Sequence, residues 1–125
     1  MTYYSAPGVK KVTVCPVEFT EAMKISFAKD IITSVAKFYD VPMDKVMNKG
    51  RKGNVPIVRQ MSCYIINEKV KGLNLRTISS LFGWAYYNSA GFDHSAIIHN
   101  IKTVKDLLSV NDPIADDYHT LLKII

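Results

Sequence analysis

The sequence predicts an all-α protein of about six helices. Apolar residues return at steps of three and four in successive stretches of the chain, which is the period of an amphipathic helix. Residues that favour helix starts (Thr, Asn, Asp, Pro) precede these stretches, and glycines follow several of them. The one candidate strand is "KKVTV", in which polar and apolar residues alternate, and it is at most a short one. An all-α class therefore accounts for nearly the whole chain.

The first half is expected to hold three helices after an irregular N-terminal extension, residues 1–18. Thr20 is the expected N-cap of the first helix. A short helix follows at about 43–48 and stops before Gly50. Pro56 opens the third helix, which runs to about residue 71. The expected apolar positions are Ile25, Ala28, Ile31, Ile32, Val35, Phe38 and Tyr39 in the first helix, and Val58, Met61, Ile65, Ile66 and Val70 in the third.

Three further helices are expected in the second half, so residues 19–125 form one domain. Asn74 caps a short helix that Gly83 ends, and residues 84–92 form an unusually long turn. Asp93 caps a long helix to about Val110, and Pro113 starts the last one. The faces expected to be buried are Leu75, Ile78, Leu81 and Phe82, then Ile97, Ile98, Ile101, Val104, Leu107 and Leu108, and finally Ile114, Tyr118, Leu121 and Leu122.

Composition places the chain among globular proteins of the reducing cytoplasm. Its 125 residues are 48% apolar, enough for one core. We find neither an apolar run of bilayer length nor a secretory signal, so no membrane partner is expected. Cys15 and Cys63 lack CxxC spacing, which argues against a disulfide framework and a zinc knuckle.

Charge is distributed unevenly along the chain. Between Lys45 and Arg76 lie eight basic residues and one acid, Glu68, whereas the stretch from Asp106 to the C-terminus holds four acids and one base. A basic middle beside an acidic tail favours a polyanionic partner at one surface. A solvated basic face without a partner explains the same pattern.

Catalysis has little support. "GRKGNV" lacks the GxxxxGK[ST] pattern of a phosphate-binding loop. His94 and His99 are five residues apart, about 140° around a helix, which does not suit a shared metal. Cys63 and His94 could be drawn as a nucleophile pair, but Cys63 lies among core positions and is interpreted as a small packing residue. We expect no enzyme, cofactor, metal or nucleotide.

Residues 73–108 begin and end like a helix-turn-helix, a pair of helices whose second member reads DNA. With its apolar face inward, that second helix presents Ser95, His99 and Lys102, with His94 in its first turn. Ser and His can read base edges, and Lys suits a phosphate. The alternative is the solvated polar face of an ordinary core helix, and for Asp93 a simple N-cap.

The glycine-rich basic segment "KGRKGN" is a second candidate for DNA contact. It can act as an arm that inserts Arg51 into a minor groove, or it can be a solvated linker. Arg59 and Gln60, at the start of the next helix, are candidates for gripping phosphate.

From about Ile31 to Ile125 the chain resembles the C-terminal DNA-binding domain of the bacterial replication initiator family, DnaA. The resemblance rests on four stretches in the family's order, "IITSVAKFYDVPMDKVMNKGRK", "VRQMSCYIINEKV", "LRTISSLFG" and "DHSAIIHNIKTV". It implies a helix-turn-helix of the TrpR and DnaA domain IV type, here with an enlarged turn. It also implies double-stranded DNA as partner. The DNA-binding residues that we carry forward are Arg51, Lys52, Arg59, Gln60, Arg76, Asp93, His94, Ser95, His99 and Lys102.

The resemblance assigns roles within that set. Arg51 falls where the family's arginine enters the minor groove, and Arg59 and Gln60 fall where phosphates are gripped. Asp93, His94 and Ser95 fall where bases are read in the major groove. The sequence has no counterpart of the family's ATPase module, so we expect a freestanding accessory or regulatory factor of replication or transcription, and a phage or a mobile element is one expected source.

The chain departs from the family chiefly between the two helices of the motif. The turn gains about seven residues, Phe92 replaces the family's arginine before Asp93, Ala96 replaces a hydroxyl residue and Arg76 a proline. The insert, "WAYYNSAGF", has three possible uses that the sequence leaves open: a cap on the core, a DNA contact, or a protein-docking patch at Trp84, Tyr86 and Tyr87. The last is the basis of a second hypothesis, an interaction module without DNA binding.

Overall fold

The computed structural model describes residues 20–89, 91–110 and 113–125, and within them it is all-α as predicted. The expected extension 1–18, with its possible short strand and Cys15, lies outside the described residues. The helices are α1 (Glu21–Phe38), α2 (Met43–Val46), α3 (Val55–Lys69), α4 (Leu75–Ser80), α5 (His94–Ser109) and α6 (Pro113–Ile124). Between α4 and α5 lie a 3-10 turn, η1 (Gly83–Tyr86), and a two-stranded ladder of β1 (Tyr87–Asn88) with β2 (Gly91–Phe92).

The three predicted N-caps are confirmed. The side chain of Thr20 accepts a hydrogen bond from the Met23 N–H at 3.2 Å, and that of Asn74 accepts one from the Thr77 N–H at 2.8 Å. Asp93 Oδ1 accepts from the Ser95 N–H at 2.9 Å. Each cap satisfies a backbone donor that has no partner inside its helix. Three predicted ends are wrong by about two residues: α2 ends at Val46, α3 at Lys69 and α4 at Ser80.

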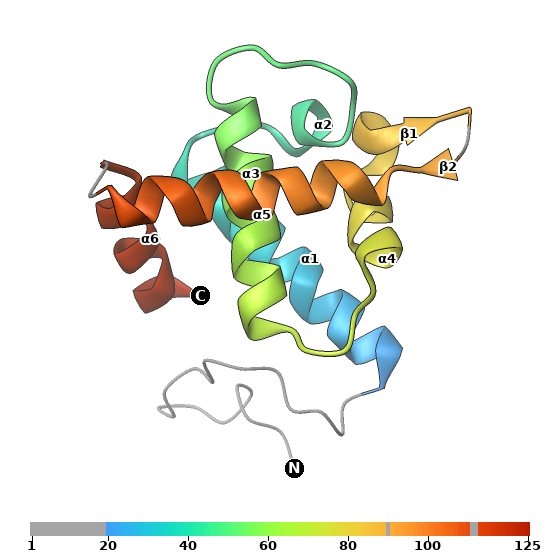
Figure 1. Ribbon diagram of the computed structural model, residues 1–125, viewed down its shortest axis with the longest axis horizontal. Helices are drawn as coiled ribbons and strands as arrows, with labels where there is room; N and C mark the ends of the chain where they lie inside the picture. The colour runs from blue at the N-terminus through green and yellow to red at the C-terminus, as the bar shows by residue number, and fades with distance from the viewer. Residues whose placement is uncertain (1–19, 90, 111–112) are drawn as a thin grey trace.

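Helix α3 lies at the centre of the fold and contacts both α1 and α5 (Figure 1). Most residues of the predicted apolar faces are buried, and Phe27 and Ala36 of α1 join them. Ile98 is an exception. It was expected to be buried and is 50% exposed, because Ile97 and Val104 face α3 and Ile98 lies 100° further round the helix. The polar residue Asn100, on the same helix, is buried.

The acidic C-terminal helix packs against the far end of the molecule from the insert. Figure 1 shows α6 beside one end of α5, whereas β1 and β2 lie at the other end. The Tyr39 hydroxyl donates a hydrogen bond to Asp117 Oδ2 at 2.8 Å, and the Tyr118 hydroxyl donates one to Glu68. Burial and these carboxylates raise the pKa of both tyrosines. Part of the acidic tail is therefore used to hold α6 on α1 and α3.

Candidate nucleic-acid interface

The start of α5 is exposed and firmly held. Asp93 caps the helix, and its own N–H donates to the Tyr86 carbonyl oxygen at 2.8 Å. His94 and Ser95 follow in the first turn with exposed side chains. The predicted N-cap role of Asp93 is thus confirmed. Of the three residues expected to read bases, Asp93 is partly exposed, and His94 and Ser95 are exposed.

Further along α5, the exposed face is polar with one apolar residue in it. His99 and Lys102 are exposed, as expected for that face. Ile98 lies among them, and with Ile101, Lys102 and Lys105 it lines a shallow hollow. Sequence alone does not separate Ile98 from its buried neighbours, because a pattern of two adjacent isoleucines leaves open which one faces the core.

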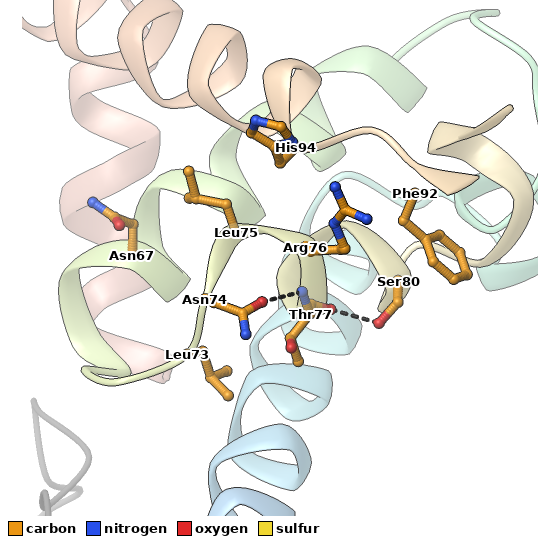
Figure 2. A pocket seen from close by; sticks show the side chains of 9 residues that line it. All are labelled: Asn67, Leu73, Asn74, Leu75, Arg76, Thr77, Ser80, Phe92 and His94. Atoms are coloured by element: carbon orange, nitrogen blue, oxygen red, sulfur yellow. Dashed lines mark hydrogen bonds between the residues drawn. The ribbon is translucent and has the colours of Figure 1, made fainter. Parts of the chain in front are cut away.

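Arg76 comes close to His94 across the junction of the two helices. Both line a hollow formed by the α3–α4 connection, the first turn of α4 and Phe92. Figure 2 shows the guanidinium of Arg76 directed toward the start of α5, between His94 and the ring of Phe92. The Asn74 cap fixes the first turn of α4, from which Arg76 projects. A basic side chain therefore lies next to the expected base-reading turn.

The basic loop between α2 and α3 is organised by Arg59. Arg59 is only 4% exposed. Its Nε donates to the Val46 carbonyl oxygen at 3.1 Å, and its terminal nitrogens donate to the carbonyl oxygens of Gly50 at 2.7 Å, of Lys45 at 3.1 Å and of Asn48. A guanidinium that donates to four carbonyl oxygens organises the loop first of all, and because Arg59 also lines the groove beside α5, its expected contact with phosphate stays a prediction.

Burial of Arg59 follows from its position on the helix. It comes four residues after Val55 and seven before Ile66, on the buried face of α3. Within the described ranges no acidic side chain pairs with it, so the carbonyl dipoles at the end of α2 and in the loop balance its charge. Burial and the nearby Arg51 lower the pKa of the guanidinium. The remaining expected residues of this region, Arg51 and Lys52, are exposed, and Gln60 is partly exposed.

The insert serves as a cap on its inner side. Tyr86 packs edge-on against Phe82 with ring centroids 5.6 Å apart, and the Arg59 guanidinium lies 5.9 Å from the centre of its ring. Asn100 Nδ2 donates to the Tyr86 hydroxyl at 2.7 Å, which explains why this amide is buried. Asn100 also contacts the Cys63 sulfur at 3.5 Å. Asn100 was not anticipated, although it lies three residues after Ile97 on the inward side.

These buried groups are neutral. Burial raises the pKa of the Cys63 thiol to about 12 and that of the Tyr86 hydroxyl to about 12. The interpretation of Cys63 as a packing residue is confirmed, since it is fully buried and protonated at physiological pH. Across the described ranges there is neither a cluster of three metal-ligand side chains nor a helix able to cross a membrane.

The outer side of the insert is aromatic and exposed. Trp84 is 62% exposed and Tyr87 39%. The ring of Tyr87 lies edge-on to both Trp84 and Phe92, with centroids 5.1 Å apart in each pair. Tyr87 also pairs with Phe92 in the β1–β2 ladder. The predicted long turn is therefore a small hairpin that caps the core with Tyr86 and displays two other aromatic residues.

Comparison with known proteins agrees with this geometry. Residues 28–104 match the family model described as the bacterial dnaA protein helix-turn-helix. The chain is 32% identical over 105 residues to the chromosomal replication initiator protein DnaA of Neisseria meningitidis and, equally, of Neisseria gonorrhoeae, which covers 84% of the chain and 19% of each relative. Identity to the DnaA of Streptococcus thermophilus is 27% over 111 residues, 89% of the chain and 20% of the relative. The chain thus spans about a fifth of these relatives, and no solved structure matches it.

Proposed function

This chain belongs to the bacterial DnaA helix-turn-helix family, and from that premise we propose that it binds double-stranded DNA in a sequence-specific manner. The observation that carries the proposal is a single groove lined both by Arg51 of the basic loop and by Asp93 and Ala96 at the start of α5. The two elements expected to enter neighbouring DNA grooves therefore lie side by side. An arm and a recognition helix used together in this way are a known mode of DNA binding.

In the proposed complex the candidate residues divide into base readers, a minor-groove residue, phosphate contacts and residues that hold these in place. His94 and Ser95 read bases in the major groove, and Arg51 enters the adjacent minor groove. Lys52, Gln60, Arg76 and Lys102 contact phosphates, and His99 lies at the edge of the reading surface. Asp93 holds the first turn of α5 in place, and Arg59 holds the loop that carries Arg51.

We further propose an accessory or regulatory role in replication or transcription, carried out in the cytoplasm by binding and without catalysis. Support for replication comes from the relatives, which are named as chromosomal replication initiators. Because the chain corresponds to only a fifth of their length, the activities of the whole initiator are not assigned to it.

The first test of this proposal is the salt dependence of binding to duplex DNA. If Arg51 in the minor groove and Lys52, Arg76 and Lys102 on phosphates each displace one condensed counterion, affinity should fall on the order of 100-fold between 50 and 200 mM salt. Titration of a labelled duplex at both concentrations measures this. Absence of binding at the lower concentration would exclude the proposal.

A second candidate, a protein-docking module, is favoured by one observation, the exposure of Trp84 beside Tyr87. Aromatic residues of this kind are enriched at protein interfaces. This alternative predicts partner binding that salt hardly affects and that Arg51→Ala leaves unchanged. The basic loop next to the start of α5 has no role in it.

A further inference from the structure

The groove that joins the basic loop to α5 is completed by the insert. Lys49 and Arg51 line it from the loop, Tyr87 and Asn88 from the insert, and Asp93 and Ala96 from the beginning of α5. The sequence named the segment 49–54 as a candidate DNA contact and left DNA contact as one of three uses of the insert, without selecting Lys49 or Tyr87 individually. The groove thus adds two candidate contacts that come from the loop and from a segment that the family normally lacks.

The insert is fixed at both of its ends to the elements that flank the groove. The Trp84 N–H donates to the Met47 carbonyl oxygen at 2.8 Å, which ties the insert to the start of the basic loop. Gly83 has φ +59, and a Cβ there would meet the Met47 carbonyl oxygen at 2.7 Å, so this approach requires glycine. At the other end, the Asp93 N–H donates to the Tyr86 carbonyl oxygen. The position of Tyr87 between loop and helix is therefore set by the backbone.

The place of the groove indicates what occupies it. A duplex has a sugar-phosphate strand between its major groove and the adjacent minor groove. If α5 enters one and Arg51 the other, that strand must pass over the surface between them, and this surface is the groove. Its charge suits the strand, because the described residues that line it include three cations, Lys49, Arg51 and Arg59, and one acid, Asp93.

We infer that the insert is a third DNA contact, in which Lys49 and the Tyr87 hydroxyl bind phosphates of the strand that separates the two DNA grooves. This inference rests on the proposed function. Tyrosine hydroxyls and lysines are common donors to phosphate oxygens. The edge-on contacts of Tyr87 with Trp84 and Phe92 hold its ring in place before DNA arrives, so little side-chain entropy is lost on binding.

The test uses a duplex that the wild-type chain selects from a random pool, with a neutral methylphosphonate placed at one backbone position at a time. Tyr87→Phe removes only the hydroxyl and keeps the ring contacts, and Lys49→Ala removes one exposed cation. Tyr64→Phe, which removes a hydroxyl outside the groove, and Lys71→Ala, at the opposite end of α3, are the matched controls. Affinity is measured for each protein on each duplex.

Tyr87→Phe is expected to weaken binding of the unmodified duplex about three- to tenfold. Lys49→Ala should also weaken binding and lower the magnitude of the salt slope by about 0.9. Among the methylphosphonates that weaken wild type, those at the phosphates bound by Lys49 and Tyr87 should lie between the bases sensitive to Arg51→Ala and those sensitive to His94→Ala. At those positions the modification should have little further effect on Tyr87→Phe or Lys49→Ala, a non-additivity that indicates direct contact. Both controls should behave as wild type.

Two results would overturn the inference, and they are distinguishable. If Tyr87→Phe and Lys49→Ala bind every duplex as tightly as wild type while Arg51→Ala and His94→Ala do not, the insert does not contact DNA although the proposed function stands. The exposed aromatic residues would then belong to a protein interface. If wild type holds no duplex at all, the proposed function fails and the inference fails with it.

Discussion

Replacing Arg59 by alanine is expected to lower the free energy of unfolding by about 2–4 kcal/mol. The substitution leaves the carbonyl oxygens of Lys45, Val46, Asn48 and Gly50 without their donor, in a place where water replaces it only in part. Each buried acceptor left unsatisfied costs about 1–3 kcal/mol, reduced here by the solvent that reaches the loop. Chemical denaturation followed by circular dichroism measures the loss.

The matched control is Arg51→Ala, an exposed arginine of the same loop, which should change stability by no more than about 0.5 kcal/mol. Arg59 also has an expected effect on DNA binding through the loop it holds. Assayed where both proteins are folded, Arg59→Ala should lose the contribution of Arg51, so the double variant should bind little worse than either single variant. Equal stability of Arg59→Ala and wild type, or additive losses of affinity, would contradict a loop-positioning role.

Arg51→Ala is expected to lower affinity for the selected duplex by about 1–3 kcal/mol, roughly five- to 150-fold, and to relax base preference at one end of the site. The side chain is exposed on a loop that Arg59 holds beside α5, so its removal should leave the fold intact. Competition titrations against the same duplex measure the loss, and Lys71→Ala is the control for a change of charge alone.

The proposed position of Arg51 in the minor groove leads to a sharper prediction about base preference. An inosine–cytosine pair presents the minor-groove edge of adenine–thymine and the major-groove edge of guanine–cytosine. At the positions governed by Arg51, wild type should accept inosine–cytosine as well as adenine–thymine and reject guanine–cytosine. Arg51→Ala should not distinguish the three. A wild type that treats inosine–cytosine like guanine–cytosine would place Arg51 in the major groove instead.

Much of the fold could be predicted because its signals are local. Thr20, Asn74 and Asp93 cap the helices that follow them, and each cap bond joins residues two or three positions apart. The apolar stripe of α3 depends only on the helical period. Such features are determined by a few neighbouring residues, so they can be found from a single sequence.

What could not be predicted depends on contacts between distant residues. Arg59 is satisfied by carbonyl oxygens nine to fourteen positions away, which no local pattern shows. Asn100 is buried because Tyr86 and Cys63 accept from its amide. The ladder of Tyr87 with Phe92 had a partial signal in the turn-forming residues between them, Asn88, Ser89 and Gly91, although its place beside the basic loop had none.

The insert illustrates how a family motif can tolerate added residues. Backbone hydrogen bonds hold it at Trp84, which donates to Met47, and at Tyr86, which accepts from Asp93. Closing a slightly longer loop costs little entropy. Tyr86 then adds contacts with Phe82, Arg59 and Asn100 that compensate for ordering the extra residues. The helices on either side keep their caps, so the motif lengthens without losing its geometry.

The central claim is that the start of α5 reads DNA sequence, and selection from a random duplex pool tests it most directly. Wild type, His94→Ala and the control Lys71→Ala would each be allowed to retain duplexes, which are then sequenced. We predict that wild type and Lys71→Ala enrich the same motif and that His94→Ala loses the enrichment at one or more positions while still holding DNA at low salt. Enrichment of an unchanged motif by His94→Ala, or of no motif by wild type, would contradict the claim.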